Sequence, residues 1–164
     1  MLDSTTASFR DVLKRLVYPV CIVSCKDLNG INYAITVSSV TSVSFDPPSL
    51  LVCINSSSSI ASVMKKNMKL NISFLNSSQK DIADLCSNPS KKESRFHDQN
   101  WEFDHNLNPY VNNAQGVAFC ILSKIVDHGT HQVILLNLED IKLHEGKINP
   151  LLYGNQHYLE KFTF

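Results

Sequence analysis

Small hydroxyl side chains gather in two neighbouring parts of the sequence, where they could bind a ligand without surrounding it with charge. The stretch TVSSVTSVSFDPPSLLVCINSSSS, residues 36–59, contains eleven Ser or Thr among 24 residues, and Asp46 is its one charged residue. Side chains at consecutive strand positions point to opposite faces, so one face of such a strand would be polar without being charged. That face suits a neutral ligand held by hydrogen bonds.

The second hydroxyl cluster could hold a phosphate group. In INSSSSIASVMKK an apolar strand ends at Asn55, four serines follow, and a short helix is expected from about Ile60. Backbone N–H groups and hydroxyls at a junction of this kind can bind an anion. The alternative is that the serines only cap the helix. Neither a GxGxxG nor a Walker motif is present, and the chain has five glycines in all, which argues against a glycine-rich phosphate loop.

Histidine and cysteine do not predict a metal site. The five cysteines form no CxxC pair, and CIVSC at 21–25 lacks the ligand spacing of a zinc site. Cys21, Cys53 and Cys120 lie in apolar, strand-like runs, which is typical of buried, reduced thiols. His131 begins a strand after a tight turn, where a structural hydrogen bond would account for it.

The elements that would position these residues are mainly β-strands. Apolar residues at 9, 12, 13, 16 and 17 share one face of an expected N-terminal helix, with Arg10, Lys14 and Arg15 outside that face. A second helix begins at Ser77 or Ser78. Because no βαβ alternation occurs, we predict an antiparallel barrel or sandwich with six or seven strands, mostly joined as hairpins. The strand patterns are VCIVSC (20–25), INYAITV (31–37), PSLLVCIN (48–55), KLNISFL (69–75), GVAFCILSKIV (116–126), HQVILLNLEDIKL (131–143) and a short strand in NPLLYGNQHY (149–158), with a long loop at 87–115.

Length, composition and charge limit the class of protein. The 164 residues suit one domain, residues 1–164, and 43% hydrophobic with 18% charged residues is a globular composition. Fifteen basic and fifteen acidic residues cancel, which argues against nucleic acid or an anionic membrane as partner. No apolar run approaches the roughly 20 residues of a membrane span. The N-terminus has no signal-peptide pattern, so we expect a cytoplasmic protein.

Taken in order, these motifs resemble the flavin reductase-like family, the small reductases of two-component flavin monooxygenases. The resemblance rests on T-x-S-S at 36–39, on S-V-S-x-D-P-P at 42–48, and on the apolar strand that ends in Asn and serines. It continues through KLNISFLNSSQKDIA, ESRFHDQNW and HGTHQVILLNLEDI, and it covers nearly the whole chain. The G-T-H at 129–131 is most similar to the reductase components of 4-hydroxyphenylacetate 3-monooxygenases.

The resemblance implies a six-stranded split β-barrel of the Greek-key type, mainly β with a few short helices, that dimerises with FMN at the subunit interface. It places the T-x-S-S segment beside the isoalloxazine and ribityl groups and residues 53–55 on the cofactor's other side. The four serines, together with their backbone amides, would approach the phosphate. The implied cofactor-binding residues are Thr36, Val37, Ser38, Ser39, Cys53, Ile54, Asn55, Ser56, Ser57, Ser58, Ser59, Arg95 and Phe96.

Arg95, Phe96 and His131 each have an alternative role. Arg95 is implied near the phosphate end of the cofactor, but it could also be an exposed charge. Phe96 could instead anchor the loop by packing on Trp101. The resemblance implies that His131 is the catalytic residue, positioning the nicotinamide rather than acting as an acid or base. Two departures from the family are Leu136, where many members carry Gly, and Tyr18, where small residues are usual.

By resemblance, the function is the reduction of FMN, or of FAD, by NADH or NADPH. The reduced flavin then passes to a separate oxygenase. Hydride moves from nicotinamide C4 to flavin N5, and the two cofactors carry that chemistry. The protein therefore needs no conspicuous nucleophile, triad or metal. The alternative is a non-catalytic FMN-binding split-barrel protein that stores or senses flavin.

Overall fold

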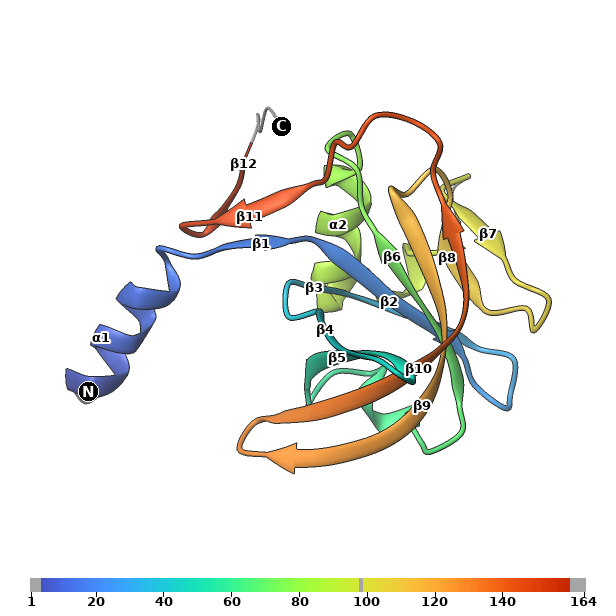
Figure 1. The fold of residues 1–164 in the computed structure, drawn as a ribbon, viewed down its shortest axis with the longest axis horizontal. Helices are drawn as coiled ribbons and strands as arrows, with labels where there is room; N and C mark the ends of the chain where they lie inside the picture. The colour runs from blue at the N-terminus through green and yellow to red at the C-terminus, as the bar shows by residue number, and fades with distance from the viewer. Residues whose placement is uncertain (1–3, 98, 160–164) are drawn as a thin grey trace.

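The computed structural model describes residues 4–97 and 99–159, and its main feature is a curved antiparallel sheet of seven strands (Figure 1). The two edge strands are consecutive in the chain, joined by residues 38–40, so the sheet curls back on itself. The predicted mainly β, antiparallel fold is confirmed, and the main sheet has seven strands where the family resemblance implied six. In sheet order the strands are β3 (Asn32–Val37), β2 (Cys21–Lys26), β6 (Lys69–Phe74), β9 (Gly116–His128), β10 (His131–Leu143), β5 (Pro48–Asn55) and β4 (Thr41–Phe45).

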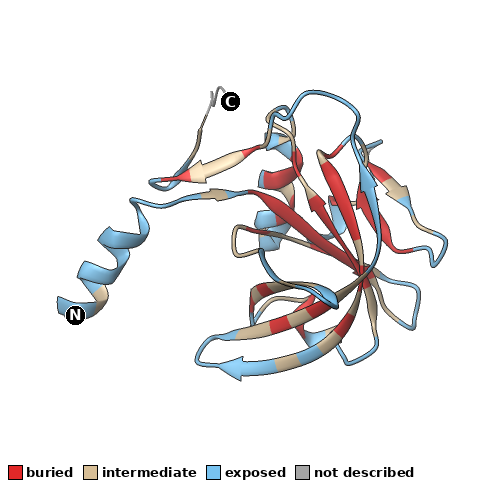
Figure 2. Cartoon of the chain, viewed as in Figure 1, coloured by how far each residue is buried: buried red, intermediate tan, exposed pale blue. Residues whose placement is uncertain are grey.

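Strand β2 shows why several strands are apolar on both faces. Cys21, Val23 and Cys25 belong to the cluster that fills the barrel interior. Ile22 belongs to a second cluster outside the sheet, which includes Trp101. Because protein covers both faces, the usual apolar–polar alternation disappears, and the first five residues of β2 are all buried (Figure 2).

The two α-helices differ in what covers their apolar faces. Helix α2 (Lys80–Ser87) buries Ile82, Ala83 and Cys86 in the outer cluster. Helix α1 (Ser4–Leu13) projects away from the barrel, and none of its ten described residues is buried (Figures 1 and 2). It ends before residues 16 and 17, which the pattern had included. The 3₁₀ helices are η1 (Ala61–Val63) and η2 (Pro89–Ser94). Within the described ranges, every helix falls short of what a bilayer crossing requires.

Two small sheets stand beside the barrel. The first joins β1 (Val17–Pro19), β11 (Leu152–Gly154) and β12 (His157–Leu159) in the order β1–β11–β12. The second pairs β7 (Trp101–Phe103) with β8 (Pro109–Val111). Strands β1, β4, β7, β8 and β12 were not among the predicted strands. All of these except β4 have three residues, too few for a periodic signal, and β4 has the sequence TSVSF, rich in hydroxyl residues.

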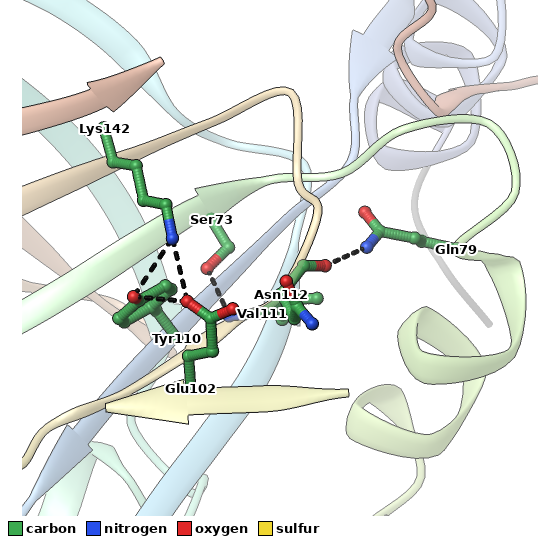
Figure 3. A network of polar contacts seen from close by, with 7 residues as sticks. All are labelled: Ser73, Gln79, Glu102, Tyr110, Val111, Asn112 and Lys142. Atoms are coloured by element: carbon green, nitrogen blue, oxygen red, sulfur yellow. Dashed lines mark hydrogen bonds and ion pairs between the residues drawn. The ribbon is translucent and has the colours of Figure 1, made fainter. Parts of the chain in front are cut away.

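Residues 101–112, which we call the middle segment, are held to the barrel at several points, although a loop was expected there. The Tyr110 hydroxyl donates to Glu102 Oε2 at 2.6 Å. Lys142 Nζ, on β10, donates to the same carboxylate oxygen at 2.8 Å and to the Tyr110 oxygen at 3.2 Å (Figure 3). Hydrogen bonds from Lys142 and Tyr110 lower the pKa of Glu102, and the bond to Glu102 raises the pKa of Lys142.

Buried hydrogen bonds complete the attachment of the middle segment. The Val111 N–H donates to Ser73 Oγ at 3.0 Å, and Gln79 Nε2 donates to the Asn112 carbonyl at 2.7 Å (Figure 3). Asn71, 1% exposed, donates through Nδ2 to the carbonyls at 108 and 109, both at 3.2 Å. The middle segment is therefore a fixed part of the outer layer rather than a mobile loop.

Candidate functional site

Two adjoining cavities lie where β3 ends. The larger, about 850 Å³, is enclosed by the end of β3, by α2 and by the β11–β12 hairpin. The smaller, about 510 Å³, lies between α1 and the turn that joins β11 to β12. Ser38, Tyr153 and Gln156 line both. Both volumes fall in the range of roughly 300–1,000 Å³ that small-molecule sites occupy.

The T-x-S-S segment lines these cavities, with its hydroxyls used in different ways. Thr36 and Ser38 line the larger cavity, and Ser38 and Ser39 line the smaller one. The Thr36 hydroxyl donates to the Ala83 carbonyl at 2.7 Å, which ties β3 to α2. Ser39 Oγ donates to the Cys53 carbonyl at 2.8 Å and accepts from its N–H at 3.1 Å. Within the T-x-S-S segment, Ser38 is thus the residue that lines both cavities.

The wall of the larger cavity formed by α2 and β12 combines opposite charges with aromatic surface. Lys80 and Asp84 line it from α2, and Tyr158 lines it from β12. Lys80 Nζ lies 5.7 Å from the centre of the Tyr158 ring. Burial, followed by a hydrogen bond with Asp84, raises the pKa of Tyr158. A lining of hydroxyls, a phenol and a balanced charge pair fits a neutral aromatic ligand with polar edges, such as an isoalloxazine ring.

The serine turn at 55–59 is bonded largely to itself and to the neighbouring hairpin. Asn55 Oδ1 accepts from the Ser57 N–H at 2.9 Å and from the Ser57 hydroxyl at 2.8 Å. The Ser58 N–H donates to the Asn55 carbonyl, and the Ser56 N–H donates to the Thr130 carbonyl, both at 3.0 Å. The amides of these three serines, expected to approach a phosphate, are therefore already occupied within the chain. The capping alternative has a contact of its own, since Ser58 Oγ accepts from the N–H of residue 61 at 3.4 Å.

The β10–β5 pairing brings His131 to the serine turn, and neither His131 nor residues 53–59 line the two cavities. His131 lies opposite Asn55 in the register, and its exposed ring has Nδ1 2.9 Å from Thr130 Oγ1. On β5 the alternation of strand side chains decides which residues can reach a ligand. Ile54, 1% exposed, packs in the barrel interior, whereas Cys53 is half-buried and Asn55 exposed. The side chain of Ile54 therefore packs in the core, and the contact of this residue with a cofactor stays a prediction.

Arg95 and Phe96 are packed into the protein away from both cavities. Arg95 is 5% exposed, and its Nη1 and Nη2 donate to the carbonyls of Ala34 at 2.6 Å and Asn88 at 2.9 Å. Burial lowers the pKa of its guanidinium. The Phe96 ring packs on Trp101 with ring centres 4.6 Å apart. The Arg95 guanidinium thus connects the end of η2 to β3, and its contact with the phosphate of a cofactor stays a prediction.

The cavities also have lining residues that the sequence did not assign to the site. Arg10 of α1 and Lys14, which follows it, line the smaller cavity, and Lys80 lines the larger one. Tyr153 and Gln156 line both. Tyr153 and Gln156 belong to YGNQHY, a motif whose resemblance to the family could have pointed to the site. Spacing alone does not tell which side chains of this motif face inward. Arg10 and Lys14 looked like the solvated side of a helix.

Three of the five cysteines are buried thiols of the barrel interior. Burial raises the pKa of the Cys21, Cys25 and Cys120 thiols to about 12, so they stay protonated at neutral pH and unreactive as nucleophiles. Over residues 4–97 and 99–159, no three His, Cys, Asp or Glu side chains gather in a way that could hold a metal ion.

Comparison with known sequences identifies relatives over almost the whole chain. The profile of the family described as "Flavin reductase like domain" matches residues 13–160. An NADH-dependent FMN reductase, RutF, of Pseudomonas syringae pv. syringae (strain B728a) is 30% identical over 151 residues, which cover 92% of this chain and 84% of that protein. The reductase component of an FADH(2)-dependent resorcinol hydroxylase from Rhizobium sp. (strain MTP-10005) is 28% identical, covering 92% and 84%.

Solved structures agree with this relationship. A candidate flavin reductase from Haemophilus somnus 129PT superposes with a TM-score of 0.86 at 29% identity, covering 96% of this chain and 99% of that one. BorF, the flavin reductase component of a bacterial two-component tryptophan halogenase, shares the fold with a TM-score of 0.82 at 23% identity, covering 94% and 96%. Because the family profile spans nearly the full length of the sequence, this chain belongs to the flavin reductase-like domain family.

Proposed function

We propose that this protein reduces FMN, or FAD, with NADH or NADPH and releases the reduced flavin to a separate monooxygenase. The observation that carries the proposal is the hydroxyl-lined pair of cavities at the T-x-S-S segment, in a chain that belongs to this family. One hydride from the dihydronicotinamide and one proton from solvent convert the oxidised flavin to its two-electron-reduced form. The redox chemistry belongs to the two substrates, so the protein binds, orients and shields them.

Flavin is placed along residues 36–39, with Cys53 and Asn55 on its other side. Support comes from the paired bonds between Ser39 and Cys53, which hold these two parts of the chain together. Because the amides of residues 56–58 are bonded within the chain, a phosphate at the serine turn would depend on hydroxyl groups. We therefore propose that the hydroxyl groups of the four serines contact the phosphate. These are Ser56, Ser57, Ser58 and Ser59.

His131 positions the nicotinamide in this proposal. Its ring is exposed beside the Asn55 turn, and its Nδ1 is already in contact with Thr130. The Nε2 atom thus remains for a hydrogen bond to the carboxamide of a bound nicotinamide. His131 need not transfer a proton, because the hydride passes directly from the dihydronicotinamide to the flavin.

The working form is a homodimer. The outer face of α1 leaves Phe9 60% and Val12 57% exposed, although their spacing is that of a buried helix face. Contiguous apolar surface of this kind marks an interaction site. A second copy of the chain is the proposed cover, and the smaller cavity beside α1 would then lie next to the dimer interface.

An aromatic hydroxylase of the 4-hydroxyphenylacetate 3-monooxygenase type is the proposed recipient of the reduced flavin. The Gly129-Thr130-His131 sequence supports this choice. The relative from Rhizobium supports the wider class, since it is the reductase component of a resorcinol hydroxylase.

Stopped-flow oxidation of NADH and of NADPH, each with and without FMN, tests the proposal. We expect oxidation that depends on added flavin, and titration showing about one FMN per chain. Binding of FMN without oxidation of either nucleotide would favour the storage or sensing alternative. Absence of FMN binding at micromolar concentrations would contradict both functions.

A further inference from the structure

We propose that Arg10 of α1 and Lys14, the residue that follows α1, bind the diphosphate of the nicotinamide dinucleotide and thereby set the affinity for the hydride donor. This inference rests on the proposed function, because it takes a phosphorylated dihydronicotinamide as the donor. It assigns a part in substrate binding to a helix whose ten described residues are all outside the core.

The position of the two cations follows from the geometry of α1. Residues four apart lie on the same side of a helix, one turn from each other. Arg10, Leu13, Lys14 and Leu16 line the smaller cavity, whereas Phe9 and Val12 do not. Phe9 and Val12 therefore remain for a second copy of the chain, while their apolar neighbours Leu13 and Leu16 form part of the cavity wall.

The charges of the smaller cavity suit a diphosphate. Arg10 and Lys14 are the two charged residues among the described residues that line it, and both are cationic. Lys14 pairs with Asp11 at 2.8 Å, but the Asp11 side chain is 68% exposed and is not part of the lining. Such an exposed pair is weak, so it leaves Lys14 able to bind a ligand. Arginine's planar fork of donors matches the geometry of phosphate oxygens.

The remaining walls of the cavity suit the two heterocycles of a dinucleotide. Tyr18 and Tyr153 supply aromatic surface, and the turn that joins β11 to β12 supplies the amides of Asn155 and Gln156. The cavity meets the larger one at Ser38. Two ligands placed in adjoining cavities can come into contact there, as hydride transfer requires.

The central experiment measures how the loss of both cations changes donor binding. The variants are Arg10→Ala, Lys14→Ala and the double variant, assayed with NADH at saturating FMN. We expect the double variant to raise KM for NADH about tenfold, because two charge-assisted contacts are lost. The kcat and the affinity for FMN should change less than twofold. Arg10→Lys should retain most of the affinity.

Arg15→Ala is the matched control. Arg15 is a cation next to Lys14 in the sequence but does not line the cavity. It should leave KM for NADH within twofold of the wild-type value. An equal rise in KM for Arg15→Ala would mean that general surface charge, and not the cavity, attracts the nucleotide, which would overturn the proposal.

A donor without phosphates separates diphosphate binding from other effects. With 1-benzyl-1,4-dihydronicotinamide, the double variant and the wild type should react at the same rate. Equal losses with both donors, or an unchanged KM for NADH in an active enzyme, would overturn the inference. Calorimetric titration with NAD⁺ needs no turnover, so it tests diphosphate binding even if the wild type is inactive. The double variant should bind NAD⁺ about tenfold more weakly than the wild type. Equal binding would contradict the assignment.

Discussion

The middle segment and helix α1 both lie outside the barrel. The side chains of the middle segment are bonded to the rest of the chain, whereas those of α1 are largely exposed. In the middle segment, Glu102 and Tyr110 are bonded to Lys142, and Val111 is bonded to Ser73 (Figure 3). In α1 the apolar residues are exposed, and two cations, Arg10 of α1 and Lys14, the residue after the helix, face a cavity. Polar groups bonded in the interior stabilise the fold, whereas exposed apolar side chains and cations held only by a weak surface pair remain for a second chain or a ligand.

The largest expected effect concerns α1 and association. Val12→Asp would place a carboxylate in the proposed interface, and we expect the dimer to weaken at least about a hundredfold, because burying an unpaired charge is costly. The unfolding free energy of the single chain should change by less than about 0.5 kcal/mol, since the site is exposed. Analytical ultracentrifugation measures the first quantity and chemical denaturation the second.

Arg15→Asp is the control for that prediction, because it introduces a carboxylate, with a larger change in charge, just after α1 and outside the apolar face. If the wild type already sediments as one 18.4 kDa chain when saturated with FMN, the interface assigned to α1 is wrong.

Asn71→Ala tests the attachment of the middle segment. It removes a buried donor and leaves the carbonyls of Asn108 and Pro109 with fewer bonds, so the unfolding free energy should fall by about 2–3 kcal/mol. Asn106→Ala, on an exposed position of the same segment, should change it by less than about 0.5 kcal/mol. Equal, small losses in urea denaturation would show that the segment contributes little to stability.

His131→Ala tests a side chain that is exposed but proposed to meet a ligand. The kcat/KM for NADH should fall roughly tenfold to a hundredfold, equivalent to about 1–3 kcal/mol, while FMN affinity stays nearly constant. A joint fall in melting temperature and FMN affinity would identify His131 as structural. His128→Ala, across the β9–β10 hairpin, is the control and should leave kcat/KM unchanged.

The smallest expected effect is the pH dependence of the Glu102–Lys142 contact. The pKa of Glu102 is lower in the folded state than its ordinary value. The contact therefore stabilises the fold above that ordinary value, and the gain is lost as pH falls through the lowered pKa. Compared with Glu102→Gln, the wild type should be more stable by about 0.5–1 kcal/mol at pH 7, with the difference vanishing in acid.

Glu93→Gln, on the exposed η2, is the matched control for this titration. A stability difference between wild type and Glu102→Gln that persists unchanged into strong acid would show that Glu102 acts through packing and not through its charge. Denaturation curves recorded across the acid range decide between these outcomes.

Local periodicity was enough to locate most of the strands. The patterns for β5 and β10 coincide with the observed bounds Pro48–Asn55 and His131–Leu143, because an apolar strand bounded by turn residues is defined by its own sequence. The T-x-S-S segment was likewise recognisable, and it does line a cavity. The apolar pattern of α1 was visible too, although nothing local showed that the helix would stand apart from the barrel.

Only the tertiary structure decided how particular site residues are used. Arg95 bonds to Ala34, 61 positions away in the sequence, and the Ser56 amide bonds to the Thr130 carbonyl of a distant hairpin. The inward direction of Ile54 follows from the register of β5 against β10. Sequence patterns indicate which residues could bind a ligand. A donor that forms a hydrogen bond to a remote carbonyl of the same chain is no longer available to that ligand. The folded chain chooses those partners by long-range pairing, which no local pattern contains.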